Sequence, residues 1–191
     1  DQYQVYEYKH SYGYHWQFPR NCLQLNQGPY SPGDFESPGE YGPQAFSEIG
    51  QLAGIAATDW SWSPLLADYD LDGRKDLFIS NGIPHRPNDN DYLRYISSNE
   101  VQHNAGDLEL IGKMPSGEAK NYCFRNKGDL TFENVSEKWG LDLKGCSNGA
   151  VYADLDNDGD LDLVTNNLNE PATLLRNNTS GRHFLKIKFS G

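Results

Sequence analysis

Residues 153–167 read ADLDNDGDLDLVTNN, with an aspartate at every second position before the chain turns apolar and β-branched. The aspartates are Asp154, Asp156, Asp158, Asp160 and Asp162. Because like charges this close repel one another, either solvent or a bound cation must neutralise them. The apolar, β-branched residues that follow are typical of a strand. We therefore expect an acidic loop that leads directly into a β-strand.

A second acidic run lies upstream, DYDLDGRKD at 68–76, and it aligns with DLDNDGDLD at 154–162. Both fit the pattern D-x-D-x-D-G-x-x-D, and they are named here the first and the second acidic loop. The offset between them is 86 residues, and the same offset carries Phe46 to Phe132. The two loops therefore belong to a sequence repeat and are not isolated acidic clusters.

The repeat extends beyond the loops. NCLQLNQG (21–28) matches NYCFRNKG (121–128), and TLLRNN (173–178) is a third, partial copy. The unit reads as a short strand ending in Asn, a turn, a Phe-led stretch, a Gly, a strand, an acidic loop and another strand. Without insertions it has about 45–60 residues, the size of a four-stranded propeller blade. We expect an all-β fold of antiparallel, blade-like repeats with calcium loops and one helical insertion.

The repeat divides the chain into five segments. They are an aromatic N-terminal segment or the end of a preceding blade (1–20), a first repeat unit (21–82), a partly helical insertion (83–120), a second repeat unit (121–168), and a partial repeat with the start of a following module (169–191). In the insertion, 88–104 is the best helix candidate, with Asn88 or Asp89 as its N-cap. The pattern of 4–18 fits either a helix or a strand. Since only two full copies occur, we expect a segment of a larger propeller.

The acidic loops are suited to calcium, a hard cation that takes six to eight oxygen ligands. Alternate carboxylates of a tight loop can point inward together, and the Gly permits the sharp turn. The predicted side-chain ligands are Asp68, Asp70, Asp72 and Asp76 in the first loop and Asp154, Asp156, Asp158 and Asp162 in the second. Arg74 and Asp160 are predicted to offer their backbone carbonyls. The sequence thus predicts two Ca²⁺ sites.

Other interpretations of the loops are weaker. An EF-hand would require Glu at the twelfth position, which is Ile79 or Thr165 here, and helices on both sides. Magnesium favours fewer protein ligands and more water. A solvated acidic turn is the remaining alternative, but two copies in one register with Gly at the same place argue against it.

Composition excludes several classes of function. The formal net charge of −11 argues against binding to nucleic acid or to anionic lipid. No run of about 18 apolar residues occurs, so we expect no membrane insertion. The sequence holds no H-E-x-x-H, G-x-S-x-G, P-loop or G-x-G-x-x-G pattern. His85 and Arg86 could bind an anion, but a solvated loop is the simpler explanation. We predict no catalytic residues and expect that the chain is not an enzyme.

Two further features leave alternatives open. Cys123 and Cys146 could form a disulfide, although the spacing of the cysteines favours buried thiols. Trp60 and Trp62 share one face of an alternating stretch, where they could stack on a sugar. Burial within a blade is favoured, because large aromatic side chains mostly lie inside.

The repeat resembles that of a known protein family. The alternation of 153–167 with RNKGDLTFENVSEKWGL (125–141) resembles the VCBS/FG-GAP repeats of extracellular β-propellers, with VCBS the closer variety. The stretch ATLLRNNTSGRHFLKIKFSG (172–191) is similar to the junction with an ASPIC/UnbV module in cartilage acidic protein-like proteins. The resemblance implies calcium loops of the kind found in integrin α-subunits.

We therefore expect a calcium-stabilised repeat segment that acts as a protein- or glycan-binding scaffold. The alternative is a non-catalytic or loop-assembled part of a carbohydrate-active enzyme. The expected location is extracellular, on the cell surface or in the periplasm, where millimolar calcium fits moderate loop sites. The expected partners are a protein or carbohydrate ligand and other blades of the parent chain; the sequence does not identify the ligand-binding residues.

Overall fold

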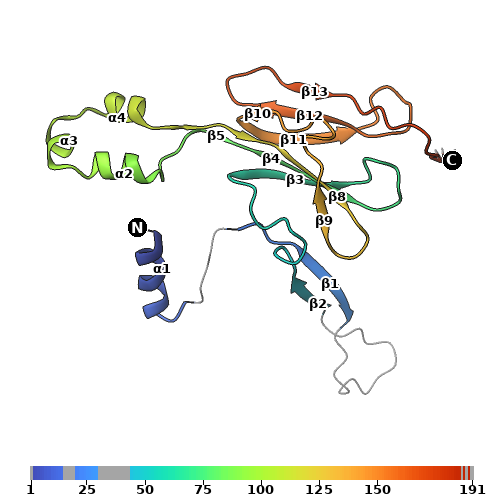
Figure 1. Ribbon diagram of the computed structural model, residues 1–191, viewed down its shortest axis with the longest axis horizontal. Helices are drawn as coiled ribbons and strands as arrows, with labels where there is room; N and C mark the ends of the chain where they lie inside the picture. The colour runs from blue at the N-terminus through green and yellow to red at the C-terminus, as the bar shows by residue number, and fades with distance from the viewer. Residues whose placement is uncertain (1, 15–19, 30–43, 186, 188, 190–191) are drawn as a thin grey trace, which may run out of the picture.

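The structure is a computed structural model, and it describes residues 2–14, 20–29, 44–185, 187 and 189. It consists mostly of antiparallel strands with a few short helices (Figure 1). The helices are α1 (Gln2–Ser11), α2 (Asn90–Ile96), α3 (Asn99–Asn104) and α4 (Asp107–Lys113). The strands are β1 (Gln24–Pro29), β2 (Gln44–Glu48), β3 (Ser61–Ala67), β4 (Asp76–Asn81), β5 (Ile83–His85), β6 (Ser116–Gly117), β7 (Ala119–Lys120), β8 (Tyr122–Asn126), β9 (Phe132–Asn134), β10 (Lys144–Gly145), β11 (Ser147–Ala153), β12 (Asp162–Asn167) and β13 (Thr173–Leu175). The prediction of an antiparallel, mostly β fold is confirmed.

Two sheets form the body of the molecule. The four-stranded sheet has the order β3-β4-β8-β9, and the three-stranded sheet has the order β11-β12-β13. Strands β1 and β2 form a separate hairpin that projects from the body (Figure 1). The pairs β5-β6 and β7-β10 complete the strand pairing. Every pair is antiparallel.

The four-stranded sheet crosses the boundaries of the sequence repeat. Its strands β3 and β4 come from the 21–82 unit, whereas β8 and β9 come from the 121–168 unit. Gly82, where the chain leaves β4, has a φ of +105°, and a Cβ there would overlap the carbonyl oxygen of Gly145. Only glycine fits this position, where the chain leaves the sheet for the insertion and later returns to it through β8.

The insertion holds three short helices instead of the single helix expected over 88–104. Asp89 is the N-cap of α2, and its side chain accepts hydrogen bonds from the amides of Asp91 and Tyr92. The helix then stops because the Ser97 hydroxyl donates to the Leu93 carbonyl at 2.6 Å and the next serine, Ser98, adopts an extended backbone as the N-cap of α3. The prediction of one continuous helix is wrong for this reason. The N-terminal segment, which fitted either structure, begins with helix α1.

Apolar side chains cover both faces of the four-stranded sheet. On one face Leu77, Ile79 and Phe124 pack with Ala53 and Ile55, which follow the β1-β2 hairpin. The opposite face packs on the three-stranded sheet through a second cluster. The buried members of that cluster are Ala67, Tyr69, Phe78, Cys123, Val135 and Leu163. The two sheets are therefore stacked face to face through a shared core.

The packing repeats one step further along the stack. Leu65, Phe78 and Cys123 form a row across the four-stranded sheet, which the three-stranded sheet covers. The equivalent row of the three-stranded sheet is Val151, Val164 and Leu174. Val151 is 57% exposed and Leu174 63% exposed. The outer face of the three-stranded sheet is thus an uncovered copy of a buried interface.

Cys123 and Cys146 are both buried and free, so the interpretation as thiols is the one that the structure supports. Burial raises the pKa of the Cys123 thiol well above its usual range. None of the helices in the described ranges has the length and apolar character that crossing a bilayer requires.

The stacked core yields a matched test within one sheet. Leu163→Ala, at a side chain only 3% exposed, is expected to lower the free energy of unfolding by about 2–5 kcal/mol. Leu174→Ala, at the exposed outer row, is expected to lower it by less than about 0.5 kcal/mol. Urea denaturation followed by circular dichroism measures both. Equal effects would contradict the assignment of inner and outer faces.

Candidate metal centres

Each acidic loop connects two antiparallel strands, as the sequence predicts. The first lies between β3 and β4, and the second between β11 and β12. The backbone is left-handed at the same two positions of each loop. These positions are Leu71 (φ +53°) and Gly73 (+87°) in the first loop, and Asn157 (+65°) and Gly159 (+96°) in the second. Leu71 and Asn157 lie within the narrow left-handed region that L-residues can adopt, whereas the motif glycines have larger φ values, which glycine adopts without strain.

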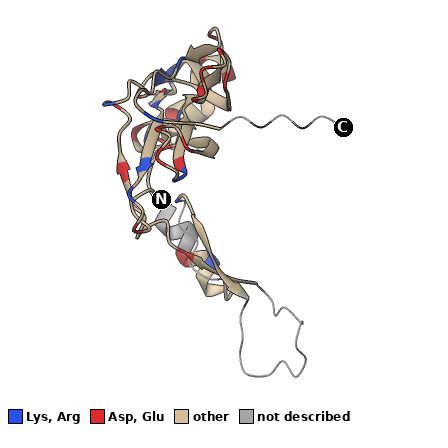
Figure 2. Cartoon of the chain, turned by 90° about the vertical axis from the view of Figure 1, so that its right-hand side faces the viewer, with Lys and Arg blue, Asp and Glu red and all other residues tan. Residues whose placement is uncertain are grey.

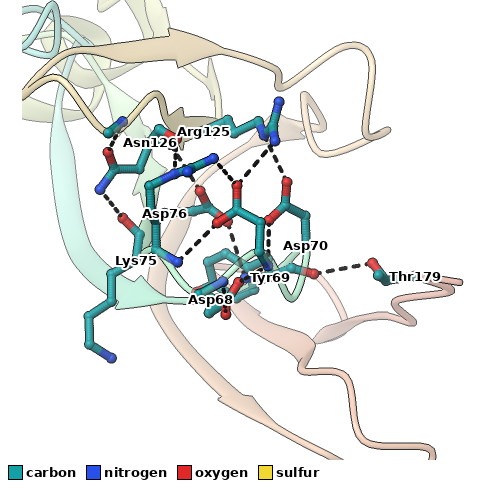
Figure 3. Close-up of polar contacts among 12 residues, drawn as sticks. Asp68, Tyr69, Asp70, Lys75, Asp76, Arg125, Asn126 and Thr179 are labelled. Carbon is teal, nitrogen blue, oxygen red and sulfur yellow. Dashed lines mark hydrogen bonds and ion pairs between the residues drawn. The ribbon is translucent and has the colours of Figure 1, made fainter. Parts of the chain in front are cut away.

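The last aspartate of the first loop, Asp76, ties the loop to the sheet. It is fully buried at the start of β4. Its carboxylate accepts the amide of Tyr69 from within the loop at 3.1 Å and the amide of Asn126 from β8 at 2.9 Å (Figure 3). One carboxylate therefore closes the hairpin and joins it to the neighbouring strand.

The second loop repeats this arrangement atom for atom. Asp162 accepts the amide of Leu155 at 3.0 Å and that of Asn177, just beyond β13, at 2.8 Å. Asn177 thus takes the place of Asn126, and both asparagines use their side-chain oxygen to accept an amide two residues ahead. Both asparagines therefore cap the turn that follows a strand.

The structure brings three of the predicted ligands of the first loop together. Asp68, Asp70 and Asp76 each have a carboxylate oxygen within 4.8 Å of the other two. The Asp72 carboxylate instead pairs with the guanidinium groups of Arg74 and Arg125. Arg74 therefore contributes a charged side chain to the loop, in addition to the carbonyl that the sequence predicted as a ligand.

In the second loop the gathered carboxylates are those of Asp154, Asp156 and Asp158, again within 4.8 Å. Asp160, predicted to act through its carbonyl, is 2% exposed. Its Oδ2 accepts the amide of Thr179 at 2.9 Å, and its Oδ1 is buried and has no hydrogen-bond partner among the described residues. The structure thus adds a buried carboxylate to this loop.

Two arginines that sequence reasoning missed lie against the loops. Arg125 of β8 contacts Asp70 at 2.7 Å and Asp72 at 3.1 Å (Figure 3). Arg176, beyond β13, contacts Asp156 at 2.6 Å and Asp158 at 3.7 Å. The sequence signal for these arginines is the Arg-Asn pair that recurs in two copies of the repeat, as Arg125-Asn126 and Arg176-Asn177. Figure 2 shows basic residues among the acidic ones in the stacked sheets.

Burial makes the ionised loops costly without a cation. Desolvation raises the pKa of Asp76 to about 6, and the nearby charges of Asp70 and Asp72 act in the same direction. Desolvation, followed by the hydrogen bond and charge of Asp158, raises the pKa of Asp160 to about 6. A bound cation would favour the charged form of both groups.

The two loops are joined to each other. The Asn177 side-chain amide donates to the carbonyl of Tyr69 at 2.7 Å. The Thr179 hydroxyl donates to the same carbonyl at 3.2 Å (Figure 3). A cavity of about 330 Å³ lies at this junction, with Asp70 and Arg176 among its lining residues. The residues after β13 therefore contact both candidate metal centres.

The donor set fits calcium. It consists of carboxylate oxygens, which are hard ligands, held close together by strand pairing. The orphaned Oδ1 of Asp160 is a buried acceptor in need of a positive partner. When bound, calcium would supply two positive charges and fix the hairpin turns; Asp68, Asp70 and Asp76 would hold it in the first loop, and Asp154, Asp156 and Asp158 in the second.

Comparison with known proteins supports the repeat. The sequence model of the FG-GAP-like repeat family matches residues 104–165, which include the whole second loop. A segment of 64 residues is 39% identical to cartilage acidic protein 1 of Xenopus tropicalis. That segment is 32% of this chain and spans only 10% of the relative. The resemblance to an FG-GAP-like repeat is confirmed over this range.

Asn177 provides a test of the junction that does not involve metal. Asn177→Ala removes the donor to Tyr69 and the acceptor for Thr179. In excess EDTA it is expected to lower the free energy of unfolding by about 1–3 kcal/mol, since partly buried polar groups lose partners. Asn178→Ala, the exposed neighbour, is the control, with an expected loss below about 0.5 kcal/mol. Similar melting curves for both variants would contradict the coupling of the loops.

Proposed function

We propose that the chain is a calcium-stabilised segment of an extracellular β-propeller of the VCBS/FG-GAP kind, and that its repeat surface binds a protein or a glycan. The observation that carries the proposal is the duplicated loop. Asp76 and Asp162 make the same two amide contacts in two hairpins that are 86 residues apart. This hydrogen-bond geometry is kept in both copies, and each loop gathers three carboxylates, two of them at equivalent positions (Asp68 with Asp154 and Asp70 with Asp156), as a repeated structural metal site would require.

In this proposal calcium stabilises and does not catalyse. The loops sit at the ends of strands that hold the two stacked sheets, so an ion that binds only the folded chain adds directly to stability. Among the described residues, the groups of acidic or histidine side chains close enough to share a metal are these two loops. We therefore assign no catalytic step to this segment, and the enzyme alternative gains no specific support.

The propeller assignment rests on the stacking of the sheets. The row Val151, Val164 and Leu174 copies a row that is buried in the adjacent sheet. In a propeller this row would be covered by the sheet of the next blade. Continuation of the chain into an ASPIC/UnbV module, as the resemblance of 172–191 suggests, is part of the same proposal.

The extracellular assignment follows from the proposed metal and from the family. FG-GAP repeats are typical of extracellular proteins, and the FG-GAP-like repeat covers residues 104–165. Loop sites of moderate affinity are filled at the millimolar calcium found outside cells. The same sites would be largely empty at the far lower free calcium of the cytosol.

We propose that the ligand binds beside β3. Trp60 and Trp62 are 38% and 48% exposed, so the expectation of burial within a blade is wrong. Trp62 donates its indole N–H to the Gly82 carbonyl at 2.8 Å, which fixes its ring. Trp60 lines an open groove of about 770 Å³ together with polar groups that include the ion pair of Asp59 and Arg86. An exposed indole beside polar side chains is suited to the face of a sugar.

The calcium part of the proposal is tested by thermal melts. Millimolar CaCl₂ is expected to raise the melting temperature by about 5–10 °C relative to excess EDTA. Asp70→Ala and Asp156→Ala should each reduce that rise, because each removes a ligand from one loop. Asp91→Ala, at an exposed residue of α2, is the control and should keep the full rise. Identical melts with and without calcium would overturn the calcium assignment.

The binding part is tested with a panel of neutral and acidic oligosaccharides by isothermal calorimetry in saturating calcium, a readout that does not depend on the substituted tryptophans. Trp60→Ala is expected to remove the binding signal, since the groove loses its aromatic platform. Trp62→Ala, at a residue outside the groove lining, should retain it. If the unmodified protein binds none of the oligosaccharides, the glycan part of the proposal is rejected and a protein ligand is the remaining candidate.

A further inference from the structure

The two acidic loops share a pattern but carry different charges. Residues 68–76 have a formal charge of −2, because Arg74 and Lys75 offset two of four aspartates, whereas residues 154–162 have a charge of −5. The difference arises mainly after the motif glycine, where the first loop has Arg74 and the second has Asp160. Lys75 is exposed, and its side chain points away from the gathered carboxylates (Figure 3).

The first loop already holds positive charge against its ligands. Arg125 donates to the Oδ2 atoms of Asp70 and Asp72, and Arg74 pairs with Asp72 as well. The Asp72 side chain is only 4% exposed, so these ion pairs are poorly screened by solvent. Two guanidinium groups therefore occupy oxygens that an incoming cation would need.

The second loop has less positive charge against its carboxylates. Arg176 is its one arginine contact in the described part of the chain, and the Arg176 side chain is 63% exposed, against 35% for Arg125. The loop also carries the buried Asp160, whose Oδ2 accepts the amide of Thr179 and whose Oδ1 has no hydrogen-bond partner there. This loop therefore has both more negative charge and an unsatisfied buried oxygen.

We propose that the two loops bind calcium with unequal affinity, the second tightly and the first weakly, and that Arg125 sets the difference by competing for the first site. The inference rests on the calcium sites of the proposed function. Arg125 lies against the candidate ligand Asp70 and the neighbouring Asp72, and its positive charge repels a divalent cation. In the absence of calcium it is the counter-ion that keeps the first loop folded.

Calcium titration of the full chain by isothermal calorimetry tests the inference, with CaCl₂ as the only ligand. Two dissociation constants that differ by at least about tenfold are expected at low ionic strength. Asp156→Ala should abolish the tighter step, and Asp70→Ala the weaker one. Arg125→Gln should tighten the weaker step by about threefold or more and leave the tighter step unchanged.

Further variants separate charge from geometry. Arg125→Lys keeps the positive charge, so its affinity should stay close to that of the unmodified protein. Arg94→Gln, at an 83% exposed residue of α2, is the control for removing an arginine. In excess EDTA, Arg125→Gln should melt at a lower temperature than the unmodified protein, because Asp70 and Asp72 lose their counter-ion.

The possible results are distinct. Equal affinities, loss of the tighter step in Asp70→Ala, or weaker calcium binding in Arg125→Gln would each overturn the inference while calcium still stabilises the protein. An effect of Arg125→Lys as large as that of Arg125→Gln would reject charge as the cause. No calcium heat and no calcium-dependent melting would reject the inference together with the proposed function.

Discussion

The architecture depends on a buried carboxylate at the first position of an inner strand. Asp76 begins β4, and Asp162 begins β12. Each accepts one amide from its own loop and one from the end of the neighbouring strand (Asn126 of β8) or just beyond it (Asn177 after β13), so that a single side chain joins the hairpin turn to a third strand. A buried carboxylate without compensation is costly, and these amide donors offset only part of that cost. The remaining negative charge is what makes the loops candidate cation sites.

The second constraint is the stacking of sheets on both of their faces. All six residues of β4 are buried, since Leu77 and Ile79 face one cluster and Phe78 the other. A strand with two buried faces cannot belong to an isolated hairpin; it requires a layer on each side. The β1-β2 hairpin with its following segment supplies one layer, and the three-stranded sheet supplies the other. The outer face of the three-stranded sheet repeats the same apolar row but is left exposed, since Val151 and Leu174 have no layer over them among the described residues.

The sequence predicts those features that are local and repeated. The spacing of aspartates and the 86-residue offset predict the hairpin loops and the strands that flank them, and the shared asparagines predict the turns. The sequence does not predict contacts between residues that are far apart in the chain. Arg125 reaches Asp70 only because β8 pairs with β4 across the insertion, and no pattern within one loop reveals that contact. The prediction of one helix over 88–104 is wrong for a local reason, because the hydroxyl of Ser97 competes for the carbonyl of Leu93. The prediction that Trp60 and Trp62 are buried is wrong, because the average burial of tryptophan in proteins does not determine how far a particular side chain is covered.

The coupling of the loops connects stability with the proposed role. Tyr69 lies within the first loop, and its carbonyl is held by Asn177 and Thr179, which also contact Asp162 and Asp160 of the second. A change in one loop is therefore transmitted to the other through the short segment that follows β13. If calcium binds as proposed, such coupling would let an ion in either loop stabilise both hairpins and not only its own. The same segment follows the edge strand β13, so the two acidic loops are joined at the point where the chain leaves the three-stranded sheet.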